Sequence, residues 1–153
     1  MTTTQPLELP ELEDVDELTR ADLVFYGVDH GGPSYEARIF INNPSADADT
    51  ERVDEQGYAG AFSVFGHNGC FGAEGHCLPD QRTTDAFDVR APHPLRALTK
   101  TVIATDAIRR AVVDASVQSV SVTVVPVVPD DGFPKMGPEP GRFDYVRLLT
   151  YES

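Results

Sequence analysis

The chain has 153 residues, enough for one compact core and too few for two domains of ordinary size. Its 25 acidic side chains against 12 basic ones give a formal net charge of -13, which argues against binding to nucleic acid or to an anionic membrane surface and favours a basic-surfaced protein partner. No apolar run is long enough to span a membrane and no signal segment is visible, so the sequence predicts a cytoplasmic protein without membrane contact.

The first 20 residues are crowded with carboxylates that surround a few leucines. Two prolines and this charge density favour a solvated, disordered acidic tail over residues 1–20, which leaves little apolar area to bury. The remaining residues, 21–153, are then expected to form a single domain. As an alternative, the leucines of the tail could dock on a basic partner.

Short apolar segments with alternating side chains predict about seven strands and one short helix. The strands are expected at residues 21–28, 35–41, 58–65, 86–89, 98–104, 117–128 and 143–151, and the helix at 106–113 with Thr105 as its N-cap. We expect the first two strands to pair as antiparallel neighbours, strand 58–65 to be central, and Pro126 to lie at a sheet edge or bulge.

This order of segments has no alternation of strand and helix, so the predicted fold class is all-β: an antiparallel β-sandwich or flattened barrel. The predicted core is made of alternating inward side chains from five of the segments. Its members are Val24, Ile39, Ile41, Phe62, Val64, Val122, Val124 and Leu148.

A glycine-rich loop follows strand 58–65 and contains both cysteines of the chain and two of its four histidines. The side chains that this loop could present to a metal are His67, Cys70, His76 and Cys77. Imidazole and thiolate groups in this number suit a tetrahedral Zn²⁺ or a Cu(I) ion. Two alternatives stay open: a Cys70–Cys77 disulfide, which would be unusual in the cytoplasm, or two thiols and ordinary loop histidines without a metal.

Motifs of familiar enzymes are absent from the sequence. There is no GxSxG, P-loop, GxGxxG or HExxH pattern, and no activated nucleophile or paired acid can be recognised. The sequence therefore gives no catalytic residue and favours a protein that is not an enzyme, with a small enzyme of unrecognised type as the remaining alternative.

Four segments taken together resemble the C-terminal β-domain of the type-3 copper proteins, the group of tyrosinase, plant polyphenol oxidase and haemocyanin. They are YEARIFINNP, YAGAFSVFGH, LRALTKTVIATDAIRRAVV and VSVTVVPV. In plant polyphenol oxidases an F-x-G-S-F strand leads to a histidine, and Tyr58 to Phe62 followed by His67 is similar. A V-V-V-T-L-V-P strand follows a short helix there, and Val120 to Pro126 is similar.

The resemblance implies an accessory domain without its enzyme. In this group the catalytic part is a helical bundle in which six histidines hold two copper ions, and the present chain has four histidines and little predicted helix. The β-domain of the group packs over the copper entrance and often inserts one side chain, which keeps the enzyme latent. By this resemblance Phe71 is the expected inserting side chain, unless it folds back on the sheet.

Two functions are therefore expected. The first is a non-catalytic accessory or binding module that docks on a separate copper oxidase, shielding it or assisting copper loading, as a cysteine pair does in fungal relatives. The second is a stand-alone copper- or zinc-binding protein that uses the loop from His67 to Cys77.

Overall fold

The computed structural model describes residues 3–9, 18–69, 87, 95–112, 119–132 and 134–152. In these residues the chain forms seven strands, one α-helix and one 3-10 helix. The strands are β1 (Thr3–Glu8), β2 (Leu18–Val28), β3 (Tyr35–Ile41), β4 (Tyr58–Val64), β5 (Leu98–Ile103), β6 (Ser119–Val127) and β7 (Tyr145–Glu152), and the helices are η2 (Asp54–Gln56) and α1 (Thr105–Val112).

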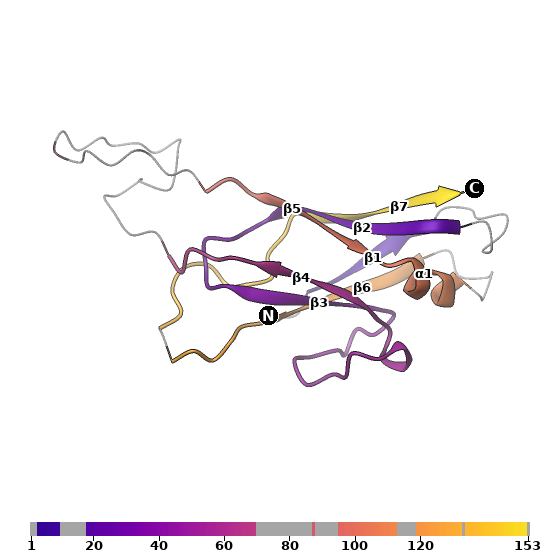
Figure 1. Cartoon of the computed structure of the whole chain (residues 1–153), viewed down its shortest axis with the longest axis horizontal. Coiled ribbons are helices and arrows are strands. Elements are labelled where there is room, and N and C mark those ends of the chain that lie inside the picture. Colours follow the sequence, from indigo (N-terminus) through magenta and orange to yellow (C-terminus); the bar gives the residue numbers. More distant parts are fainter. Residues whose placement is uncertain are drawn as a thin grey trace.

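The strands form two antiparallel sheets that pack face to face (Figure 1). One sheet has the order β1-β6-β3-β4 and the other the order β5-β2-β7. The helix α1 closes one end of the sandwich, and its residues Ala107, Ile108 and Val112 are buried. The predicted all-β antiparallel sandwich with one short helix is confirmed.

The pairing of the strands differs from the prediction in two places. Strands β2 and β3 were expected to be neighbours, but β2 lies between β5 and β7, and β3 between β6 and β4. The connection between them, residues 29–34, crosses from one sheet to the other, and three of its carbonyl groups accept hydrogen bonds from the amides of residues 67–69. Strand β4, predicted to be central, is at the edge of its sheet in the described residues, and its side chains are mostly half-buried.

The prediction of a solvated tail over residues 1–20 is wrong for the residues of it that the structure describes. Strand β1 pairs with β6 from Thr3 opposite Val124 to Glu8 opposite Ser119, and Leu7 is buried. Leu18 is also fully buried, at the start of β2. Pairing with a long apolar partner strand outweighs the proline and the flanking charges, because it satisfies the backbone polar groups and buries Leu7 between the sheets. Residues 10–17 lie outside the described part of the chain.

The core between the sheets contains most of the predicted side chains. Ile39, Ile41, Val64, Val122 and Val124 are buried in it, and Phe62 and Leu148 pack against it half-buried. Val24 is buried but lies outside this cluster. Phe25, fully buried, is the aromatic centre of the core: its ring centroid is 5.2 Å from that of Phe62 and 5.4 Å from that of Phe143.

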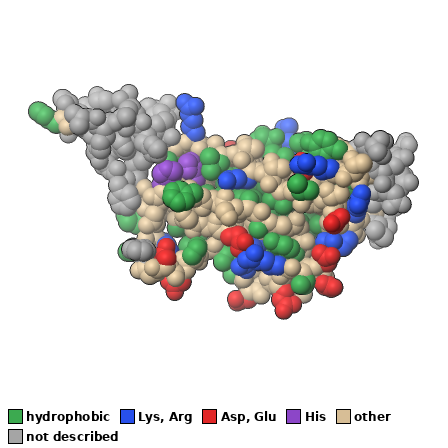
Figure 2. Space-filling view, viewed as in Figure 1, with side chains coloured by type: hydrophobic (Ala, Val, Ile, Leu, Met, Phe, Trp, Pro, Cys, Tyr) green, Lys and Arg blue, Asp and Glu red, His purple; other side chains and the backbone are tan. Residues whose placement is uncertain are grey.

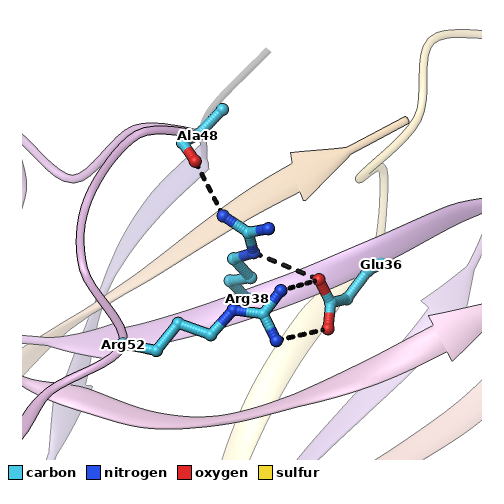
Figure 3. A network of polar contacts seen from close by, with 4 residues as sticks. All are labelled: Glu36, Arg38, Ala48 and Arg52. Carbon is cyan, nitrogen blue, oxygen red and sulfur yellow. Dashed lines mark hydrogen bonds and ion pairs between the residues drawn. The ribbon is translucent and has the colours of Figure 1, made fainter. Parts of the chain in front are cut away.

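A loop of residues 42–57 covers the other face of the β1-β6-β3-β4 sheet. Beneath it, Phe40 and Val125 form a second small cluster with Ala46 of the loop. Glu36 and Arg38 of β3 anchor the loop: Arg38 donates to the carbonyl of Ala48 at 2.7 Å, and Arg52 binds the carboxylate of Glu36 (Figure 3).

Candidate functional site

The base of the predicted ligand loop lies at the end of the sandwich opposite α1 (Figure 1). Of the predicted site residues, the structure describes His67. Cys70, Phe71, His76 and Cys77 lie outside the described residues, so their convergence on a metal, their disulfide and the insertion of Phe71 stay predictions.

Backbone hydrogen bonds join the base of this loop to the turn between β2 and β3. The amide of His67 donates to the carbonyl of His30 at 2.9 Å, that of Asn68 to Gly32 at 2.7 Å, and that of Gly69 to Gly31 at 2.8 Å. A Cβ atom on Gly66 would lie 2.3 Å from the carbonyl oxygen of Gly32, so this approach requires glycine at position 66.

Asn68 ties a third segment to this base. Its backbone has φ 51°, in the left-handed region that asparagine tolerates better than most residues. Its side-chain amide donates to the carbonyl of Pro134 at 2.9 Å and accepts a hydrogen bond from the amide of Met136, also at 2.9 Å. We call residues 29–34, 66–69 and 134–138, which meet here, the loop-base junction.

Two histidines meet at the loop-base junction. The ring centroids of His30 and His67 are 4.9 Å apart and the rings are nearly perpendicular, at 71°. Nε2 of His30 lies 2.8 Å from the carbonyl oxygen of Arg96, which can only accept, so Nε2 carries the proton. In the neutral ring Nδ1 then keeps its lone pair, an arrangement common in histidines that bind metals.

Sequence reasoning missed His30, because it treated Asp29-His30-Gly31-Gly32-Pro33 as a turn and nothing more. The signal that could have found it is an imidazole within a glycine turn, in a chain with four histidines. Within the described residues, no three His, Cys, Asp or Glu side chains come close enough together to hold a metal ion. His67 and His30 are thus two members of a set that would need further ligands.

An open cleft adjoins His30. Its volume is about 480 Å³, in the range of small-molecule sites, and its walls are largely apolar. It is lined by Gly27, Asp29, His30, Gly31, Gly69, Leu95, Ala97, Gly137, Pro138 and Asp144. Histidine side chains, in purple, are visible at this end of the molecule in Figure 2. Phe65 lies between the end of β4 and Gly66, and its side chain is 82% exposed.

In its described residues the protein has no helix long and apolar enough to cross a membrane. No protein-family model matches the sequence, and no curated protein matches it.

Solved structures place the fold in a known class. The chain is similar to part of latent aurone synthase, a polyphenol oxidase, from a natural source: the TM-score is 0.56 at 11% sequence identity, over 99% of this chain and 24% of that chain. The recombinant latent enzyme gives a TM-score of 0.51 at 12% identity, and its co-crystal with hexatungstotellurate(VI) gives 0.53 at 10%.

The protein therefore has the fold of a β-sandwich found within polyphenol oxidase, and it spans about a quarter of the length of those chains. The resemblance inferred from the four sequence segments is confirmed at the level of the fold.

Proposed function

We propose that the protein is a non-catalytic accessory domain that docks on a separate type-3 copper oxidase, where it shields the copper entrance or assists copper loading. One observation carries this proposal: almost the whole chain, 99%, superposes on a quarter of an enzyme that is described as latent. A domain with this fold and no recognisable catalytic motif is suited to bind an oxidase rather than to act as one.

The loop-base junction is the surface that we propose to face the oxidase. Main-chain hydrogen bonds of 2.7 to 2.9 Å join two of its segments, 29–34 and 66–69, and the Asn68 side chain bonds the third. Together these bonds provide a rigid base for the loop that follows Gly69. In this proposal Phe71 is the inserting side chain. The exposed Phe65 lies six positions earlier and supplies a second aromatic side chain, of a type enriched at interfaces.

The test is a reconstitution with the helical type-3 copper protein of the same genome, recognised by two clusters of three histidines. We expect a stable complex in sedimentation velocity and slower diphenol oxidation in the complex than by the helical protein alone. Phe71→Ala should restore oxidation while the complex still forms. Phe87→Ala, at an exposed phenylalanine outside the loop-base junction, is the matched control. Failure of the two proteins to associate at micromolar concentration would overturn the proposal.

The second candidate function is metal binding by the loop itself, through His67, Cys70, His76 and Cys77. The observation that favours it is the position of His30, whose ring packs against that of His67 at the base of the loop. Copper or zinc would be bound by soft thiolate and imidazole ligands, which suit Cu(I) best.

Metal analysis of the purified protein, with and without a reductant, tests this second function. Cys70→Ser and Cys77→Ser should each strongly weaken Cu(I) or Zn²⁺ binding, because thiolates are the strongest ligands available. A disulfide would instead make the same variants less stable only in oxidising buffer. Protein that titrates no metal under reducing conditions contradicts the metal site.

A further inference from the structure

The outward face of the β5-β2-β7 sheet carries large apolar side chains that the structure leaves exposed. Strand pairing sets Ile103 and Leu149 on either side of Asp22, with Tyr151 opposite Arg20 and Tyr145 opposite Tyr26. The exposed fractions are 61% for Ile103, 43% for Tyr145, 41% for Leu149 and 47% for Tyr151. We call the group made of Arg20, Ile103, Tyr145, Arg147, Leu149 and Tyr151 the tyrosine face.

Two arginines lie over tyrosine rings among these side chains. The guanidinium of Arg147 is 5.2 Å from the ring centroid of Tyr145, and that of Arg20 is 5.9 Å from the ring of Tyr151. Stacking on a ring occupies the face of a guanidinium and leaves its N–H edge available for a carboxylate. Tyrosine and arginine are also the residues that carry most binding energy at protein interfaces.

The charge of the tyrosine face is opposite to that of the whole protein. Asp22 of β2 lies between Ile103 and Leu149, and its carboxylate is already neutralised by Arg20 at 2.8 Å, with its side chain only 6% exposed. Arg147 is thus left as a net positive charge on a chain whose formal net charge is -13. In Figure 2 basic and hydrophobic side chains lie together along the upper border, over β2 and β7, and acidic ones gather along the lower border.

This charge pattern also argues against a second copy of the chain as the occupant. A symmetric contact would give neither arginine a free carboxylate to bind, because the face offers no unpaired carboxylate among its described residues.

We propose that the tyrosine face docks a protein partner that presents carboxylates among apolar side chains. The carboxylates would pair with the N–H edges of Arg147 and Arg20, and the apolar side chains would cover Ile103, Leu149 and Tyr151. This contact uses no residue of the loop-base junction and does not depend on the proposed oxidase or on a metal.

The test uses two soluble peptides, one of alternating glutamate and leucine and one with lysine in place of glutamate, titrated into ¹⁵N-labelled protein. The glutamate peptide should shift the amide signals of β2 and β7, and the lysine peptide should not. Arg147→Glu should weaken binding of the glutamate peptide about tenfold, the effect of losing one charge-assisted contact. Arg142→Glu makes the same change of charge at an exposed arginine outside the face. This variant should bind the glutamate peptide as tightly as the wild type does.

Equal shifts from both peptides, no shift on β2 and β7, or equal affinities of the two variants would overturn the proposal. If Arg147→Glu fails to fold, Arg147→Gln replaces it in the titration. Sedimentation equilibrium supplies a separate readout: a dimer that Tyr151→Glu dissociates would show that a second copy, and not an acidic partner, occupies the face.

Discussion

Arg52 binds both carboxylate oxygens of Glu36, with donor–acceptor distances of 2.9 and 2.6 Å, and so fixes the loop of residues 42–57 to strand β3 (Figure 3). Both side chains are partly exposed, so we expect Arg52→Ala to reduce the free energy of unfolding by no more than about 1 kcal/mol. The larger effect should be local, because Ala46 of this loop covers Phe40. Hydrogen exchange should accelerate in residues 45–52.

Arg52→Lys is the informative control, because lysine keeps the charge but cannot bind the carboxylate with a planar fork. The rate of amide hydrogen exchange in the loop of Arg52→Lys should lie between the rates of the wild type and of Arg52→Ala. Identical exchange in all three proteins would show that other contacts hold the loop.

The centre of the core should be more sensitive to truncation than its edge. Phe25→Ala removes a fully buried ring that contacts two other aromatic rings, so we expect a loss of about 3–5 kcal/mol. Phe62 is half-buried on edge strand β4, so Phe62→Ala should cost clearly less, about 1–3 kcal/mol. Urea denaturation measures both, and equal losses would contradict the edge position of β4.

The first strand should contribute to stability although the sequence there is acidic and contains proline. Leu7→Ala should cost about 2–3 kcal/mol, because Leu7 is buried in the main core. Glu8→Ala, one position along on the exposed side of β1, should change stability by less than about 0.5 kcal/mol. Thermal unfolding of the two variants compares them directly, and an unaffected Leu7→Ala protein would restore the idea of a dispensable tail.

Asn68 should hold the loop-base junction together through its side chain. Asn68→Gly keeps the backbone conformation at φ 51° but loses the bonds to Pro134 and Met136, so the segment 134–138 should exchange amide hydrogens faster. Asn68→Asp keeps the acceptor for the Met136 amide and loses only the donor, and its effect should be smaller. If Asn68→Gly behaves like the wild type, the backbone bonds alone define the junction.

Stability should fall in alkaline solution through Tyr35. Burial disfavours the phenolate and raises the pKa of Tyr35 above its ordinary value of 10.0; Asp29 adds to this and a hydrogen bond with the Gly141 backbone opposes it. The unfolded chain therefore loses this proton first as the pH rises through about 10, which favours unfolding. Tyr35→Phe should flatten the decline in melting temperature above pH 10. An unchanged slope in that variant would assign the decline to the other tyrosines.

Local patterns predicted individual elements well where the alternation of side chains is strict. Strand β3 spans Tyr35–Ile41 as expected, since inward Tyr35, Ala37 and Ile39 are separated by polar or outward residues. Helix α1 begins at Thr105, one residue before the predicted start, and the Thr105 hydroxyl accepts a hydrogen bond from the amide of Ala21. That partner lies 84 positions away, so a local capping rule cannot anticipate it.

What local patterns could not supply is which segments meet. Strand β1 exists because β6 offers it an edge, and neither its length nor its composition predicts it. In the same way His67 was found from its neighbours in the loop, whereas its contact with His30 depends on the turn that crosses between the sheets. The tyrosine face also depends on the register between β2 and β7, because Tyr151 and Arg20 meet only when these two strands pair.

The pairing of β1 with β6 sets an order of events during synthesis. Thr3 finds its partner, Val124, only after about 120 further residues have been made, which takes roughly 6 to 24 s at common rates of translation. Strand β2 can pair with β7 only later still, after β7 has been made. The nascent protein thus carries unpaired apolar strand edges until β6 and β7 have been made, and only then are the two sheets complete. Chaperones that bind extended apolar segments should therefore engage it while it is being made.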